Sequence, residues 1–154
     1  MSLIQELMNQ SSAGSFINSQ SIKRFTPTEI RESIQALVAN DQNDLAYALG
    51  DAGLSLHPKS EDMLAINGLL SIMRQDWAYG VELLMTLKNI QGENTQPFTY
   101  VMLVRALRCN LDLAQAIQVV AEALKYYPEQ AELLAESQDL AVYKDSMVFA
   151  GSTF

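Results

Sequence analysis

The sequence has very little cysteine and histidine, the residues from which many catalytic and metal sites are built. Its 154 residues include one cysteine, Cys109, and one histidine, His57. A single cysteine cannot form an intramolecular disulfide, which suits a reducing compartment. A lone histidine without a cluster of other ligands does not make a metal site. We therefore expect no metal, no cofactor and no enzymatic activity.

Basic residues are also scarce. Ten lysines and arginines stand against 18 acidic residues, which gives a net charge of −8. Because binding to phosphate backbones needs a basic stripe, this balance argues against nucleic acids and anionic membranes as partners. A basic protein or peptide fits the charge better, while solubility is the alternative reason for an acidic surface.

Long apolar runs are absent, so the sequence predicts no membrane-spanning helix. The first ten residues, MSLIQELMNQ, lack the basic start of a secretory signal. Together with the single cysteine, these features lead us to expect a cytoplasmic protein without direct membrane insertion.

Glycine and proline are few, with seven and four residues, and 49% of the chain is hydrophobic, which favours a helical globular fold. Residues 1–25 are expected to hold a short amphipathic helix at 3–8 and a Ser-rich linker. That helix either packs back on the domain or contacts a partner or a second copy. Residues 149–154 are expected to be a tail.

A repeat dominates the rest of the chain. Seven residues of one stretch recur 70 positions later: Pro27, Ala36, Leu37, Asn40, Ala46, Leu54 and Pro58 return as Pro97, Ala106, Leu107, Asn110, Ala116, Leu124 and Pro128. A weaker copy lies between, so the true spacing is 34 and then 36 residues. Such periods indicate stacked pairs of helices. We expect three pairs over about 26–60, 61–96 and 97–128, with a capping helix over 129–148.

Residues typical of helix starts lie at these boundaries. Thr26, Pro27 and Glu29 form the pattern of a capping box. In the capping helix, leucines at 133, 134 and 140 are expected on the inner side. Glu129, Glu132, Glu136 and Asp139 are expected on the outer, polar side.

The helix pairs resemble tetratricopeptide repeats, most clearly in the segment NLDLAQAIQVVAEALKYYP. In that family small residues occupy the crossing of the two helices, and six residues match: Ala46, Gly53, Gly68, Gly80, Ala116 and Ala123. Gly50 and Leu87 depart from the pattern, which usually has an aromatic residue and an alanine there. The resemblance implies an all-α superhelical array of three helix hairpins with an N-terminal helix and a C-terminal capping helix.

The resemblance also implies a partner-binding groove lined by the first helix of each pair. The groove positions carry over to Arg31, Gln35, Val38, Ala65, Leu69, Ile72, Met73, Phe98, Val101, Arg105 and Arg108, with Cys109 at the end of the first helix of the third pair. Apolar residues at this spacing are alternatively core residues. Arg105 and Arg108 share a helix face, where they either grip a ligand carboxylate or form salt bridges to neighbouring helices.

These features together indicate a non-catalytic module that binds a peptide or helix of another protein. Size, acidity and the extra N-terminal helix are similar to the tetratricopeptide chaperones of bacterial type III secretion. Those chaperones hold hydrophobic secreted subunits before export. The alternative is a structural assembly subunit, for example a homodimer, that self-associates through its N-terminal helix.

Overall fold

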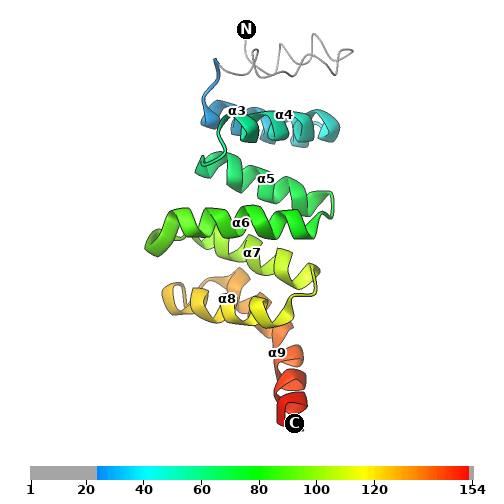
Figure 1. Cartoon of the computed structure of the whole chain (residues 1–154), viewed down its shortest axis with the longest axis vertical. Coiled ribbons are helices and arrows are strands. Elements are labelled where there is room, and N and C mark those ends of the chain that lie inside the picture. The colour runs from blue at the N-terminus through cyan, green and yellow to red at the C-terminus, as the bar shows by residue number, and fades with distance from the viewer. Residues whose placement is uncertain (1–23, 153–154) are drawn as a thin grey trace. The chain divides into compact units, whose positions relative to one another are not determined.

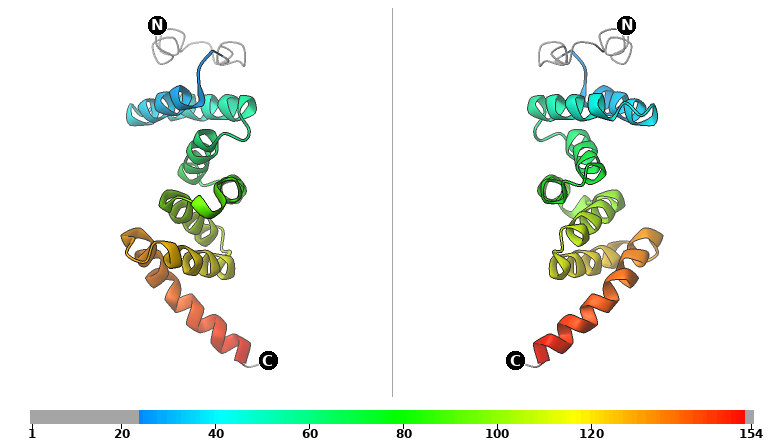
Figure 2. Two further views of the ribbon diagram at one scale, coloured as in Figure 1. Left: turned by 90° about the vertical axis from the view of Figure 1, so that its left-hand side faces the viewer. Right: turned by 90° about the vertical axis from the view of Figure 1, so that its right-hand side faces the viewer.

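The computed structural model describes the backbone of residues 24–152 and the side chains of residues 24–143. The predicted helix at 3–8 and its linker lie outside the described residues. All regular structure in residues 24–152 is helical, as the sequence predicts (Figures 1 and 2). The helices are α3 (Pro27–Ala39), α4 (Asn43–Leu56), α5 (Glu61–Met73), α6 (Trp77–Gln91), α7 (Pro97–Cys109), α8 (Leu113–Tyr126) and α9 (Ala131–Ser152), with a 3-10 turn, η2 (Gly92–Asn94).

Side-chain hydrogen bonds cap the start of α3. The Thr26 hydroxyl accepts a hydrogen bond from the Glu29 amide at 3.1 Å, and the Glu29 carboxylate accepts one from the Thr26 amide at 3.1 Å. The predicted capping box is therefore present, with Pro27 in the first turn of α3. The last helix differs from expectation, because α9 continues to Ser152 and takes in most of the predicted tail.

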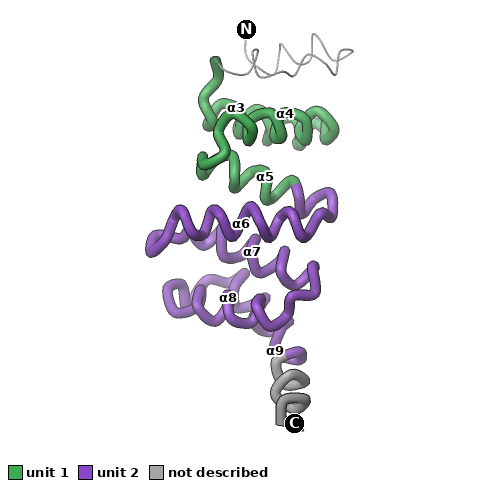
Figure 3. The backbone as a smooth tube through the Cα atoms, in the orientation of Figure 1, with its two compact units in different colours: residues 1–70 green, residues 71–154 purple. Residues whose placement is uncertain are grey.

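The chain divides into two compact units: unit 1, residues 1–70, and unit 2, residues 71–154 (Figure 3). The boundary falls inside α5, within the middle helix pair. Unit 1 therefore contains α3, α4 and most of α5. Unit 2 contains the end of α5 and all helices from α6 to α9.

The core of unit 1 joins its three helices. Its members are the buried side chains Ile30, Ile34, Leu37, Ala46, Leu49, Met63, Ile66 and Leu70. Two glycines of α4 let α5 approach closely: a Cβ atom on Gly50 would lie 2.7 Å from Asn67 Oδ1, and one on Gly53 would lie 2.7 Å from Met63 Sδ. A Cβ atom at Gly50 would therefore require Asn67 and Leu70 to move, which accounts for a glycine at the position where the tetratricopeptide pattern has an aromatic residue.

The core of unit 2 is built in the same way from successive helices that pack on one another. Its fully buried members include Leu84, Leu87, Leu103, Leu107, Ala116, Ala123, Leu133 and Leu140. A salt bridge of 3.1 Å between Lys88 of α6 and Glu122 of α8 links the second helices of the middle and third pairs. No helix in the described part of the chain is long and apolar enough to cross a membrane.

Three turns of the chain share one backbone geometry. Asp41, Gln75 and Leu111 have positive φ angles of 59°, 63° and 64°. After each of them, the next amide donates a hydrogen bond back to a carbonyl five residues earlier, at 2.8, 2.8 and 2.9 Å. This is the Schellman end of a helix. Because the three turns lie 34 and 36 residues apart, they reproduce in the backbone the spacing found in the sequence.

The turns after the second helices repeat as well. His57 and Tyr127, which are 70 residues apart, have nearly identical backbone angles: φ is −131° and −132°, and ψ is 66° in both. Each is followed by a proline, which cannot continue the helix. The Tyr127 hydroxyl also donates to the Thr95 carbonyl at 2.7 Å, which ties this turn to the loop before α7.

Candidate functional site

The predicted groove residues of unit 1 differ in how far they reach solvent. Gln35 is exposed, whereas Val38, Ala65 and Leu69 are half-buried. Val38 and Leu69 pack against the core of unit 1. The alternative assignment of these two residues to the core therefore has direct structural support, and Gln35 is the one open to a partner.

Arg31 is committed to a helix-to-helix contact within unit 1. Its guanidinium donates to Asp62 Oδ1 at 2.7 Å, and the Thr28 hydroxyl donates to the other oxygen of Asp62 at 2.9 Å. An acidic residue at this position favours the start of α5. The carboxylate of Asp62 in addition fastens α5 to α3, so Arg31 is not a free cation for a ligand.

The predicted groove residues of unit 2 include two large exposed apolar side chains. Met73 is 38% exposed and Phe98 is 42% exposed, while Ile72 is half-buried. Val101, by contrast, is 2% exposed. The groove assignment of Val101 needs correction, because its side chain faces the interior of unit 2 and belongs to the core.

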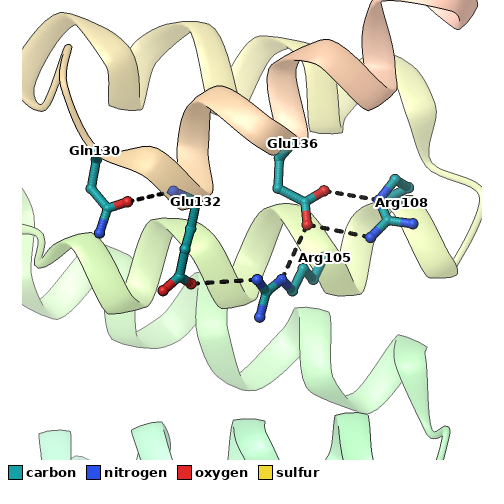
Figure 4. A network of polar contacts seen from close by, with 5 residues as sticks. All are labelled: Arg105, Arg108, Gln130, Glu132 and Glu136. Atoms are coloured by element: carbon teal, nitrogen blue, oxygen red, sulfur yellow. Dashed lines mark hydrogen bonds and ion pairs between the residues drawn. The ribbon is translucent and has the colours of Figure 1, made fainter.

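Arg105 and Arg108 both bind one carboxylate of α9 (Figure 4). Arg108 donates through Nε to Glu136 Oε2 at 2.9 Å and through Nη2 to Oε1 at 3.3 Å. Arg105 donates through Nε to Glu136 Oε1 at 3.1 Å and through Nη2 to Glu132 at 3.4 Å. Of the two functions that the sequence leaves open for these arginines, the salt bridge to a neighbouring helix is the one present.

The carboxylate at the centre of this network is buried. The Glu136 side chain is 6% exposed, whereas Arg105 and Arg108 keep 37% and 34% of theirs in solvent. A buried carboxylate is stable only when charged partners replace the water it has lost. The hydrogen bond to Glu136 in turn raises the pKa of Arg108 above its usual value. The arginine pair thus serves to bury Glu136.

The expectation that Glu136 lies on the outer side of the last helix is wrong. Glu136 lies three residues after Leu133 and four before Leu140, both of which are buried. All three therefore share one face of α9. Leu134, expected inside, is 42% exposed.

A spacing in the sequence points to both ionic contacts. Arg31 and Asp62 are 31 residues apart, and so are Arg105 and Glu136. One 34-residue period after the two arginines lie Ala65 and Asp139. The acid that pairs with each arginine lies three residues, or about one helical turn, before that position. A search for opposite charges at this interval would have found both pairs.

A pocket of about 490 Å³ lies where the end of α7, the start of α8 and α9 meet in unit 2. It is lined by Arg108, Cys109, Leu111, Leu113, Asp139 and Tyr143. Cys109, the last residue of α7, accompanies the groove positions in the sequence. The structure places it half-buried on the wall of this pocket. A second pocket of about 340 Å³ lies between α8 and α9 and is mostly apolar.

The single histidine of the sequence, His57, is half-buried in the turn after α4. Its Nε2 atom is buried and has no hydrogen-bond partner. Within residues 24–143 we find no group of three or more potential metal ligands. No protein-family model matches the chain, and no curated protein is significantly similar to it.

Proposed function

We propose that this protein is a non-catalytic module of the tetratricopeptide class that binds a segment of a partner protein on the first helices of its repeats. The observation that carries the proposal is the exposure of Met73 and Phe98, at 38% and 42%. Both lie at positions where the resemblance places ligand contacts. Large exposed apolar side chains at such positions favour protein binding over a purely structural function.

The character of these side chains suits a segment of varied sequence. Methionine is flexible and adapts to different neighbours, and an aromatic ring supplies a large contact area. Covering the exposed part of a side chain such as Phe98 contributes about 1–2 kcal/mol to binding. A few such contacts yield a moderate affinity, as expected for a partner that is held and later released.

A narrower proposal is that the partner is a hydrophobic subunit kept soluble in the cytoplasm before secretion. Support comes from the net charge of −8 and the small helical-repeat architecture. In this proposal the protein prevents aggregation of its partner without catalysing a reaction. The test adds the purified protein to a secreted hydrophobic subunit and follows aggregation by light scattering. We expect the protein to reduce the scattering.

The broader proposal is tested with random peptides, so the natural partner need not be identified first. A phage library of such peptides is selected on the immobilised full-length protein and, in parallel, on a Met73→Ser/Phe98→Ser variant. We expect peptides that are enriched on the wild type and lost on the variant. An Ile90→Ser variant is the matched control, because Ile90 is 43% exposed but lies on α6, a second helix. Enrichment that is the same on all three proteins would contradict the proposal.

A further inference from the structure

The second pocket lies at a place that a helix covers one repeat earlier in the chain. It is formed by α8 and α9, which begin 36 residues after α6 and 34 residues after α7. The corresponding place one repeat earlier is therefore the one between α6 and α7. Residues that line the second pocket include Ile117, Val120, Ala121 and Leu124 of α8 and Leu140 and Ala141 of α9.

In the earlier repeat, α8 itself covers the place between α6 and α7. It packs on α7, and Glu122 joins it to α6 through the ion pair with Lys88. Leu107 of α7 is fully buried, whereas Ala141, at the same position of α9, is exposed. In the described part of the chain no helix follows α9. The repeat thus shapes the second pocket for a second helix, and no described helix lies on it.

The residues of the second pocket suit an apolar helix better than water. The last unit of a repeat array usually presents a polar face to solvent. Here Leu124 stands where the earlier repeat has Lys88, and Ser137 is the only polar residue among the described residues of the lining. The small side chains of Ala121 and Ala141 let a helix approach closely, because the distance between packed helices depends on the side chains at the contact. The expected occupant is therefore a helix with an apolar face.

The start of the sequence carries such a face. Its apolar residues at helical spacing are Leu3, Ile4, Leu7 and Met8. Glu6 is the only charged side chain among residues 1–22. As a helix, residues 1–8 would be about 12 Å long, and the lining of α8 from Ile117 to Leu124 spans about 10 Å along the helix axis. The segment thus matches the second pocket in polarity and in length.

We propose that residues 1–8 of one copy of this protein bind as a helix in the second pocket of another copy. Residues 9–23 connect this segment to the first described helix, and a stretch of that length reaches up to about 50 Å. It is long enough to join two copies. Stacked repeats contact only their neighbours, which favours the last helices of another copy over those of the same chain. The inference is independent of the proposed function, because Met73 and Phe98 lie on α5 and α7.

The test measures the mass of full-length proteins by light scattering at low and high concentration. Leu3→Asp/Leu7→Asp changes the segment, and Ala121→Glu changes the pocket at a residue that is exposed. Ala135→Glu is the control, because Ala135 is exposed on α9 but does not line the pocket. We expect the mass of the wild type and of the control to rise with concentration. In the segment and pocket variants the rise shifts to at least about tenfold higher concentration, because a carboxylate would be buried in an apolar contact.

A mixture of the segment variant and the pocket variant gives the sharpest result. The segment variant keeps an intact pocket, and the pocket variant keeps an intact segment. We therefore expect the mixture to form a complex at a concentration where neither variant does so alone. Ala141→Glu, on the other wall of the pocket, is a second pocket variant and should behave in the same way.

Three outcomes would overturn the inference. The first is a wild type that stays monomeric at high concentration. The second is self-association that the segment variant loses and both pocket variants keep, since the segment would then bind elsewhere. The third is a mixture in which folded variants form no complex. Peptide binding at Met73 and Phe98 is measured separately on the segment variant, so a failure here leaves the proposed function standing.

Discussion

Glu136 accepts a hydrogen bond from Arg108 at 2.9 Å, which joins the last turn of α7 to α9 through a carboxylate that is 6% exposed. The contact fixes the final helix of the chain against unit 2. It also neutralises arginines that the sequence offers as ligand contacts. The same pair thus explains how α9 is held, and the proposed partner binding must depend on other residues.

Removing both arginines should be far more damaging than removing an exposed salt bridge. In an Arg105→Met/Arg108→Met variant, Glu136 stays buried without a charged partner, and we expect a loss of about 3–5 kcal/mol in the free energy of unfolding. Arg31→Met is the control, because its partner Asp62 is 30% exposed, and it should cost at most about 1 kcal/mol. Urea denaturation followed by circular dichroism measures both. Equal losses would contradict the buried network.

The glycines of the helix crossings should respond oppositely to alanine. A Cβ atom on Gly50 would meet Asn67 at 2.7 Å and Leu70 at 2.8 Å, whereas one on Gly80 would meet nothing closer than 3.5 Å. We expect Gly50→Ala to destabilise the protein by about 1–2 kcal/mol through overpacking. Gly80→Ala should stabilise it by up to about 1 kcal/mol, because alanine favours the helix. Thermal unfolding of the two variants gives the sign of each effect.

The Tyr127 hydroxyl should contribute to stability, whereas that of its neighbour should not. Tyr127→Phe removes the 2.7 Å hydrogen bond to the Thr95 carbonyl, in a segment where Thr95 is 2% exposed. The expected cost is about 1–2 kcal/mol, because a buried carbonyl loses its partner. Tyr126→Phe is the matched control, since Tyr126 is 59% exposed. Equal stability of the two variants would contradict this prediction, because the Tyr127 hydroxyl would then contribute no more than one that contacts only solvent.

Stability should fall at alkaline pH partly through Tyr100. Burial, followed by the charge of Glu122, raises the pKa of Tyr100 above its usual value of 10.0. The folded state therefore holds this proton more tightly than the unfolded state. Its contribution is complete below the unfolded pKa and is lost as pH rises through the folded pKa.

Urea denaturation at about pH 9 and about pH 11 measures this loss. Tyr100→Phe should reduce the decrease in the free energy of unfolding between the two pH values, because phenylalanine has no proton to lose. Tyr126→Phe should leave the decrease unchanged. If both variants behave like the wild type, Tyr100 does not titrate differently in the folded state.

The repeat makes much of the fold predictable, because a period leaves its mark on turns and caps that depend on local sequence. The spacing of Pro27, Asn40 and Pro58 and their copies locates the helices to within a few residues. Helix faces are harder to assign. Glu136 resembles an outer residue because it is charged, yet its position between Leu133 and Leu140 puts it on the buried face.

The pocket at Leu111 is beyond sequence reasoning for a different reason. Its walls come from the end of α7, the start of α8 with the turn before it, and α9, which meet only after folding. The positive φ of Leu111 follows from its place in the repeat, and no local glycine or asparagine at that position signals it. Val101 is misassigned for a related reason, since helical spacing alone does not separate a core-facing residue from a ligand-facing one.

The central claim is that a partner segment binds on the exposed apolar residues of the first helices. Fluorescence anisotropy with the best selected peptide tests it most directly, by comparing the Kd of wild type, Phe98→Ser and Ile90→Ser, whose original side chains are 42% and 43% exposed. We predict that Phe98→Ser weakens binding about tenfold and Ile90→Ser leaves it unchanged. Equal Kd values for all three proteins, or a loss confined to Ile90→Ser, would contradict the account.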